Sequence, residues 1–326
     1  GMQSASGGGD DAVPPLVSVE WLDQNRKARK VTILHATYDP TFQDVGFREY
    51  RSQWFLKWGK LYRRFASEND YEIGHIPDAV HFSINCCVYP SRTEKHFAYN
   101  NVQIAPYIQK LAIFPADHIV VYSNGPGNAM MYAAKARWLL GTYGFFNVSV
   151  LDGGFDQWKK LKKECTKEVV EQPNSRCIPA MINNLHLTFA DLLKPPDMPL
   201  LSDLQSMNFI DCRAESQFYG KSEPRQFGEA VTGSFIHHSK NVPYLSVLGW
   251  NGLMATKEQI KRALKEAEYE PDQRTILFCY DGLQCHLVAL AIEHVGYEAV
   301  PIFSGGLYEV ELRRPNLIDG DAETPL

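Results

Sequence analysis

One short segment of the chain combines the residue types and the spacing that nucleophilic sulfur chemistry needs. It consists of Cys279, Tyr280, Asp281, Gly282, Leu283, Gln284 and Cys285, between a predicted strand that begins at Thr275 and a predicted helix over Leu287–His294. A loop between a strand end and a helix N-terminus directs successive backbone N–H groups inward, where they bind anions. These groups and the helix dipole favour the thiolate of Cys279, which is the nucleophilic form of cysteine. Gly282 supplies the backbone freedom that such a loop requires.

The cysteines of this loop have more than one reading from their residue types alone. Most free cysteines are buried and act as small hydrophobic side chains, and Cys279 could be one of them. Cys285 lies at the start of the helix, where a small buried side chain is expected; the alternative is a resolving thiol that reacts with Cys279. We expect the other cysteines to be unreactive, at positions 86, 87, 165, 177 and 212.

The same order of predicted elements occurs twice along the chain. In the first half the elements are Val31–Ala36, Ile119–Gly125, Ala129–Leu140 and Val148–Leu151, and in the second they are Asn208–Cys212, Thr275–Gly282, Leu287–His294 and Ala299–Phe303. The strand-turn units that begin at Ile119 and Thr275 are 156 residues apart, and the glycine pairs that begin at Gly153 and Gly305 are 152 apart. Agreement over so long a period indicates duplication of a whole domain.

Strands that alternate with helices predict an α/β fold in which each half is a mainly parallel sheet flanked by helices. Ligands of such sheets bind beyond the carboxyl ends of the strands, so each half has one natural site, at the turn after its middle strand. In the first half this turn, Ser123–Ala129, has no thiol and no base to activate its serine. The first domain is therefore predicted to be structural or substrate-shaping. We predict a flexible arm at 1–12, domains at 13–160 and 186–326, and an exposed linker at 161–185.

Composition and charge exclude several classes of function. The 326 residues carry a net charge of −5, whereas a protein that binds nucleic acid or an anionic membrane surface has a basic footprint. No apolar run reaches the ~18 residues of a membrane span. Seven irregularly spaced cysteines are typical of a reducing compartment and not of a disulfide framework. Neither a metal nor an organic cofactor is implied, and the adjacent His237 and His238 are expected in a loop. The first ten residues resemble a cloning scar and a flexible arm, and a removed targeting peptide stays open.

Several motifs occur in a characteristic order from about Leu16 to Arg314. The first half contains Val17-Ser-Val-Glu-Trp-Leu, Gly74-His-Ile-Pro-Asp-Ala and Leu151-Asp-Gly-Gly-Phe with Trp158; the second contains Phe209-Ile-Asp-Cys-Arg, Phe218-Tyr-Gly, Glu223-Pro-Arg225, Asn241-Val-Pro-Tyr and the cysteine loop with Val288-Ala-Leu. In these motifs the chain resembles the two-domain rhodanese and mercaptopyruvate sulfurtransferase family. The resemblance implies two rhodanese-like domains with a catalytic cysteine in the second only.

The resemblance also implies a reaction and the residues that carry it. In that family the cysteine of a C-x-x-G-x-x-A loop takes a sulfane sulfur from a small anionic donor, thiosulfate or 3-mercaptopyruvate, and passes it to a thiol or thioredoxin-like acceptor. Carried over, Cys279 is the nucleophile and sulfur carrier, the backbone of residues 280–285 is the persulfide cradle, and Arg225 holds the donor's anionic group. Gln217 and Asn85 occupy two further positions of the family's substrate site. A cytoplasmic or mitochondrial location is expected.

Three of these positions depart from the family pattern. Gln217 replaces a second donor-binding arginine, Asn85 replaces an interdomain aspartate, and Asp281 stands where serine or lysine is usual. A carboxylate ~4 Å from the sulfur would oppose the thiolate and an anionic donor by about 4 kcal/mol before screening, at an effective dielectric constant of ~20. The sequence thus predicts a sulfurtransferase with altered donor preference, or alternatively a weak or inactive rhodanese-fold binding module. A cysteine phosphatase would need arginine in place of Cys285.

Overall fold

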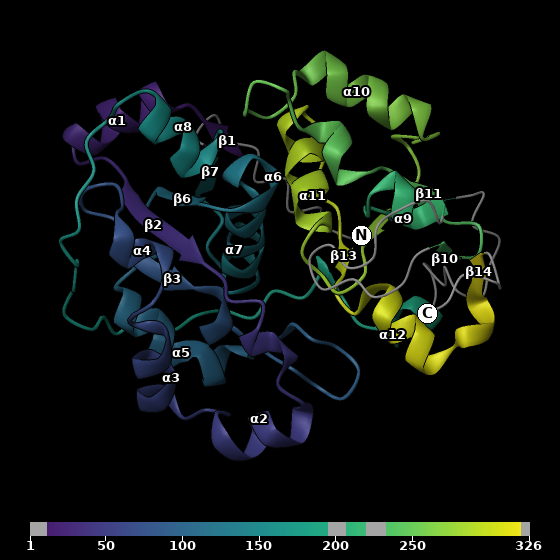
Figure 1. Ribbon diagram of the computed structural model, residues 1–326, viewed down its shortest axis with the longest axis horizontal. Coiled ribbons are helices and arrows are strands. Elements are labelled where there is room, and N and C mark those ends of the chain that lie inside the picture. The colour runs from purple at the N-terminus through teal and green to yellow at the C-terminus, as the bar shows by residue number, and fades with distance from the viewer. Residues whose placement is uncertain (1–11, 195–206, 220–232, 321–326) are drawn as a thin grey trace, which may run out of the picture.

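Apolar, β-branched runs build the first of two parallel sheets (Figure 1). The computed structural model describes residues 12–194, 207–219 and 233–320. The first sheet has the strand order β1-β7-β6-β2-β3, and every neighbouring pair is parallel. Its strands are β1 (Leu16–Val17), β2 (Thr32–Thr37), β3 (Val80–Ser83), β6 (Ile119–Ser123) and β7 (Val148–Leu151). All five residues of β6 are buried, as expected for a central strand that is covered on both faces.

The second sheet repeats the first strand for strand. It comprises β8 (His186–Leu187), β9 (Asn208–Asp211), β11 (Lys240–Asn241), β12 (Thr275–Phe278) and β13 (Ile302–Phe303). The order β8-β13-β12-β9-β11, again parallel throughout, matches β1-β7-β6-β2-β3. The predicted α/β fold with two mainly parallel sheets is therefore confirmed. Two small antiparallel pairs lie outside these sheets, β4 (Val88–Tyr89) with β5 (Phe97–Ala98) and β10 (Ser234–Ile236) with β14 (Ile318–Gly320).

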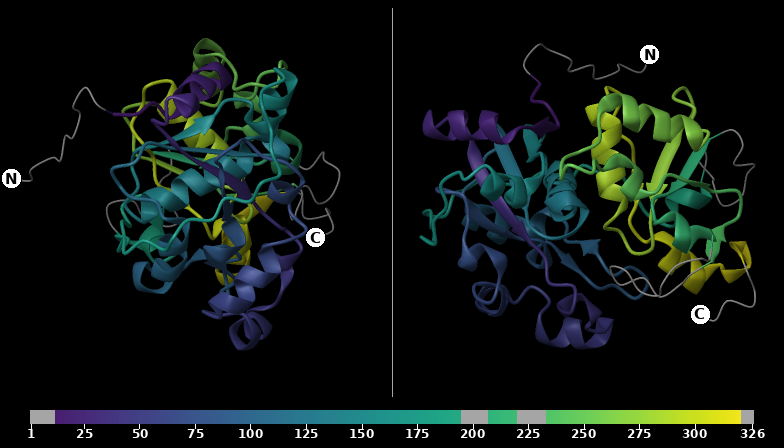
Figure 2. Two further views of the ribbon diagram at one scale, coloured as in Figure 1. Left: turned by 90° about the vertical axis from the view of Figure 1, so that its left-hand side faces the viewer. Right: turned by 45° about the horizontal axis from the view of Figure 1, so that its top comes forward.

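Helices cover both faces of each sheet (Figures 1 and 2). Those of the first unit are α1 (Val19–Lys27), α2 (Phe47–Gln53), α3 (Trp58–Phe65), α4 (Asp70–Ile73), α5 (Asn101–Leu111), α6 (Pro126–Ala129), α7 (Met131–Thr142) and α8 (Gly154–Lys160). Those of the second are α9 (Glu215–Tyr219), α10 (Lys257–Glu266), α11 (Cys285–His294) and α12 (Gly306–Arg313). Capping boxes at Asn100 and Thr256 start α5 and α10, because each side chain accepts a backbone N–H that the helix leaves free.

The alternation of side chains along the central strands divides the interior into three cores. In β12, Ile276 and Phe278 belong to a core of the second unit, whereas Leu277 and the following Cys279 belong to a central core on the opposite face of the sheet. That central core also includes the inward side chains of the first sheet, so it is continuous across both units. Helix α7 packs against α11 at its centre, and Arg137 of α7 donates to both carboxylate oxygens of Glu293 at 2.6 and 3.2 Å. The alternation therefore turns Cys279 toward the first unit.

The predicted arm lies almost entirely outside the described residues, whereas the predicted linker lies within them. Residues 1–11 of the arm lie outside the described residues. The predicted linker, 161–185, has no helix and is mostly exposed, but it runs along the first unit: Thr166 pairs with His75, and the Ala180 N–H donates to the Tyr143 carbonyl at 3.0 Å. His237 and His238 lie in the turn after β10, as predicted. Among the described residues, no helix is long and apolar enough to cross a bilayer.

Candidate active site

The loop from Cys279 to Cys285 closes around the sulfur atom of Cys279. Its thiol sulfur accepts the Gly282 N–H at 3.2 Å, and the side chain is 1 % exposed. Gly282 has a φ of +100°, and a Cβ there would lie 2.9 Å from the Ser304 carbonyl oxygen. The N–H groups of Leu307 and Tyr308 in α12 donate to the carbonyls of Cys279 and Tyr280 at 2.9 and 3.0 Å. The sulfur thus points into the loop, and α12 holds the loop from behind.

The two cysteines of the loop have opposite acidities. Burial raises the pKa of Cys279, but hydrogen bonds from the Cys285 side chain and from the N–H groups of Cys285 and Gly282 outweigh both burial and the Asp281 charge, so its pKa is lowered. Burial, and then the neighbouring Cys279, raise the pKa of Cys285 well above its ordinary value. The sulfurs lie 3.6 Å apart. Cys279 therefore reaches its thiolate form more readily than Cys285.

Asp281 is the polar side chain of the loop that most opposes this thiolate. It is buried, and burial raises its pKa to about 6, although Lys95 and Lys135 lower it. Its carboxylate lies 3.9 Å from the Lys95 ammonium group, which comes from the first unit. At neutral pH most of the carboxylate is ionised, and the first unit supplies the cations that offset it.

A hydrogen-bonded chain from the first unit holds the Asp281 backbone. His96 Nδ1 lies 2.7 Å from the Asp281 carbonyl oxygen, and His96 Nε2 lies 2.6 Å from the Tyr38 hydroxyl. Burial lowers the pKa of His96 to about 3, so the ring is neutral. Because a carbonyl only accepts, Nδ1 carries the ring proton and Nε2 accepts from Tyr38. The first unit therefore contributes to holding the cysteine loop, and its predicted structural or substrate-shaping role stays a prediction.

Lys135 of α7 is a buried cation that the sequence analysis did not identify. Its side chain is fully buried, and its Nζ has no hydrogen-bond partner among the residues that the structure describes. Burial lowers its pKa, while Cys285, Glu94, Cys279 and Asp281 act in the opposite direction through their charges. A lysine within the apolar run Met130–Leu140 was the only signal in the sequence.

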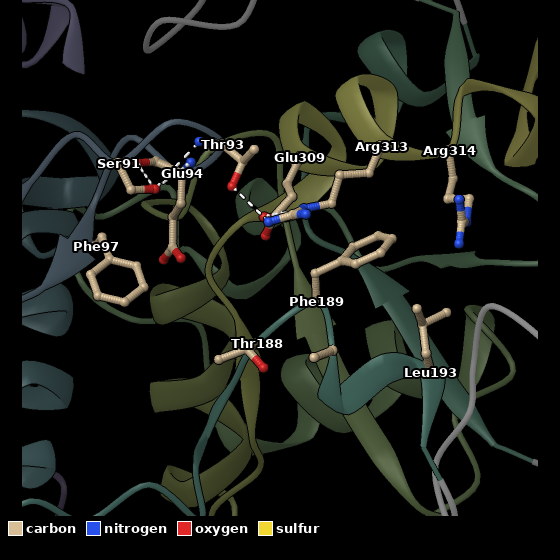
Figure 3. Close-up of a pocket in the computed structure, with 11 residues that line it drawn as sticks. Ser91, Thr93, Glu94, Phe97, Thr188, Phe189, Leu193, Glu309, Arg313 and Arg314 are labelled. Carbon is tan, nitrogen blue, oxygen red and sulfur yellow. Dashed lines mark hydrogen bonds and ion pairs between the residues drawn. The ribbon is translucent and has the colours of Figure 1, made fainter. Parts of the chain in front are cut away.

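Residues of both units, Glu94 among them, line a cavity of about 590 Å³ (Figure 3). Glu94 comes from the first unit and Glu309 from α12, and Arg313 of α12 donates to Thr93 at 3.1 Å. Burial and the neighbouring Glu309 raise the pKa of Glu94 to about 8. The cavity is lined by Ser91, Thr93, Glu94, Phe97, Thr188, Phe189, Ala190, Leu193, Glu309, Arg313 and Arg314, so Cys279 is not part of its wall.

The predicted substrate-site residues outside the loop have different surroundings. Asn85 is buried in the first unit, where its amide accepts the Asp39 N–H at 2.8 Å and donates to the Asp39 carbonyl and to Gln43. Gln217 is buried on α9, and its amide has no partner among the described residues. Arg225 lies outside the described residues. Contact of these three side chains with a donor stays a prediction, and for Asn85 it would require one of these hydrogen bonds to break.

Replacing Gly282 with alanine tests the backbone geometry of the loop. A Cβ at this position meets the Ser304 carbonyl oxygen, and alanine is strained at a positive φ, so the N–H that faces the sulfur must move. We expect Gly282→Ala to raise the pKa of Cys279 and to slow its alkylation by iodoacetamide at pH 7 about tenfold. Gly252→Ala is the matched control, because Gly252 also has a positive φ but no neighbour within 4 Å. Equal alkylation rates in both variants would contradict the view that the N–H groups of the loop lower the pKa of Cys279.

Comparison with known proteins places this geometry in context. Residues 63–161 match the rhodanese-like domain. The chain is 32 % identical to the Caenorhabditis elegans protein named "Putative thiosulfate sulfurtransferase mpst-1" over 258 residues, which cover 77 % of this chain and 79 % of that protein. It is 26 % identical to the 3-mercaptopyruvate sulfurtransferase of Mus musculus over 91 % of this chain and 92 % of the relative.

A solved structure shows the same fold at lower identity. The crystal structure of SseA from Escherichia coli, one of the 3-mercaptopyruvate sulfotransferases, superposes with a TM-score of 0.67 at 20 % identity. The match covers 90 % of this chain and 99 % of that one. The similarity therefore spans both units, with their two sheets, and is not confined to one of them.

Proposed function

Because this chain belongs to the rhodanese and mercaptopyruvate sulfurtransferase family, we propose that it moves a sulfane sulfur through a persulfide on Cys279. The donor is a small anion of the thiosulfate or 3-mercaptopyruvate type, and the acceptor is a thiol or a thioredoxin-like dithiol. The observation that carries this proposal is the Cys279 sulfur, which accepts the Gly282 N–H and has a lowered pKa despite its burial. Family membership supports sulfur transfer in general, and the residue roles are our inference.

Each step of the proposed reaction uses a group of this loop. With thiosulfate, the Cys279 thiolate attacks the outer sulfur, the S–S bond of the donor breaks, and sulfite leaves with the electron pair. The outer sulfur of the persulfide is then an anion that the N–H groups of the loop stabilise. An acceptor thiolate attacks that outer sulfur and releases the Cys279 thiolate. Lys95 and Lys135 supply positive charge near the loop, and we propose that Arg225 binds the donor.

The cellular location of the protein is part of the same proposal. All seven cysteines are free, including the exposed Cys165. Free thiols are typical of a reducing compartment, so we propose a cytoplasmic or mitochondrial location.

Mass spectrometry after incubation with a donor tests the persulfide directly. The purified chain is treated with thiosulfate and, separately, with 3-mercaptopyruvate, and the peptide that contains Cys279 is analysed under non-reducing conditions. We expect the mass of this peptide alone to change when a sulfur donor is added. In a Cys279→Ser variant we expect no change of mass. Cys165→Ser is the matched control, because Cys165 is exposed and outside the loop.

A catalytically weak binding module is the second candidate. It is favoured by the buried Asp281 carboxylate beside a cysteine that is itself only 1 % exposed. No change of mass with either donor, together with an ordinary alkylation rate at Cys279, would establish this alternative and refute sulfur transfer.

A further inference from the structure

Cys285 is positioned to react with the sulfur that the proposed reaction modifies. Its sulfur is 3.6 Å from the Cys279 sulfur, which is van der Waals contact, whereas a disulfide bond is about 2.05 Å long. The two sulfurs must therefore approach each other by roughly 1.5 Å for the bond to form. Cys285 is fully buried, and the Cys279 sulfur is in contact with its sulfur.

We propose that Cys285 is a resolving thiol that converts the Cys279 persulfide into an internal Cys279–Cys285 disulfide with release of hydrogen sulfide; this inference rests on the proposed persulfide. The Cys285 sulfur attacks the inner sulfur, Cys279 Sγ, and a new S–S bond forms. The bond between Cys279 Sγ and the outer sulfur breaks, and the outer sulfur leaves as HS⁻ with the proton of the Cys285 thiol. In this step the Cys285 sulfur is oxidised and the outer sulfur is reduced, while the Cys279 sulfur keeps the oxidation state that it has in the persulfide, so no external oxidant takes part.

The surroundings of Cys285 favour this attack over a purely structural role. The loop pattern of the family has alanine at this position, so packing alone does not require a thiol there. Lys135 is buried without a hydrogen-bond partner among the described residues. Of the neighbouring charges that raise its pKa, that of Cys285 has the largest effect. The positive charge of this ammonium group stabilises a Cys285 thiolate as it forms. Lys135 also favours the loss of the proton that the leaving sulfur takes.

The proposed step changes what the chain delivers. A persulfide that an acceptor removes yields a persulfidated acceptor, whereas the internal reaction yields free sulfide and an oxidised loop. The loop must then be reduced by an external dithiol of the thioredoxin class before the next turnover. The acceptor in this case supplies electrons and receives no sulfur.

A single-turnover experiment on the full chain tests this proposal. The reduced protein is freed of reductant and mixed with one equivalent of 3-mercaptopyruvate, and sulfide is measured with a fluorescent probe. Peptides are then analysed under non-reducing conditions. We expect about one sulfide per chain and a peptide that lacks two hydrogens and joins Cys279 to Cys285. In Cys285→Ala and Cys285→Ser we expect a stable persulfide on Cys279 and at least tenfold less sulfide.

The control is the neighbouring buried Cys212, whose pKa is raised by burial and then by Cys279, so it lies close to the same sulfur. Cys212→Ala should form the internal disulfide as the unchanged protein does. A persulfide that persists in the unchanged protein, with no disulfide, would overturn the resolving role of Cys285 and leave sulfur transfer intact. If neither persulfide nor disulfide forms with 3-mercaptopyruvate or, in a parallel reaction, with thiosulfate, both proposals fail together. The unchanged protein alone separates these outcomes, so the result does not depend on the folding of a variant.

Discussion

Replacing Asp281 with asparagine is expected to raise kcat/KM for thiosulfate about tenfold at pH 8 and to change it little at pH 5. The buried carboxylate raises the pKa of Cys279 and repels an anionic donor. Lys95 and Lys135 offset part of this repulsion, so we expect a net effect of about 1.4 kcal/mol, well below the unscreened Coulomb energy. Asp281→Ser should act in the same direction. The measurement is kcat/KM for thiosulfate across this pH range.

The pH dependence follows from the raised pKa of Asp281. Because this pKa is about 6 in the folded chain and 3.8 in the reference state, the carboxyl group takes up a proton as pH falls through about 6. The unchanged protein then resembles the asparagine variant, and the ratio of their rates approaches one. The folded state binds the extra proton between pH 3.8 and about 6, so the unchanged protein also loses stability as pH rises through that window.

The matched control for this prediction is Asp44→Asn. Asp44 lies 3.8 Å from the same Lys95 ammonium group, but its side chain is largely exposed. We expect it to change the rate less than twofold, because water screens its charge. A slower Asp281→Asn variant would mean that the carboxylate assists the reaction, for instance by holding Lys95 near the loop.

Replacing Lys135 with methionine is expected to stabilise the fold and to weaken the reaction. A buried ammonium group without a hydrogen bond costs about 2 kcal/mol or more, and methionine fills a similar volume without that cost. The same change removes a positive charge that acts on Cys279, Cys285 and Asp281. We therefore expect the free energy of unfolding to rise by about 2 kcal/mol and kcat/KM to fall about a hundredfold. Chemical denaturation and steady-state kinetics measure the two effects.

The sign of the accompanying pH effect distinguishes this cause from a change in packing. Burial lowers the pKa of Lys135, so above that pKa the unfolded chain binds one proton more than the folded chain. The stability contributed by this group therefore increases as pH rises toward the reference value of 10.5. The gain from Lys135→Met should accordingly shrink with increasing pH.

Lys159→Met is the matched control for Lys135→Met. The Lys135 Nζ lies 5.1 Å from the Trp138 ring centroid. Lys159 likewise lies over an aromatic ring, with its Nζ 4.9 Å from the Phe155 centroid, but it is exposed. We expect neither its stability nor its rate to change markedly. A less stable Lys135→Met variant would show that the charges of Glu94 and Asp281 and the Trp138 ring stabilise the ammonium group by more than its burial costs.

The sequence alone determined the features that depend on neighbours along the chain. Apolar runs around Ile119 and Thr275 predicted two central strands, and their regular offset predicted two sheets of one order. The strand, the turn with Gly282 and the start of α11 are contiguous, so the position of Cys279 at the mouth of an amide-lined loop followed from local geometry. The alternation of side chains along β12 also determines the face of the sheet toward which Cys279 points.

Only the tertiary structure decided which charges and hydrogen bonds reach that loop. Tyr38, His96 and Lys135 precede it by more than a hundred residues, and no periodicity relates them to Asp281. Their effect depends on the packing of α7 against α11, because pKa shifts depend on distance and burial. The contact between the Cys279 and Cys285 sulfurs likewise depends on the turn that Gly282 makes. Residue types along the chain therefore predicted Cys279 as the nucleophile, and packing between the two units determined its electrostatic surroundings.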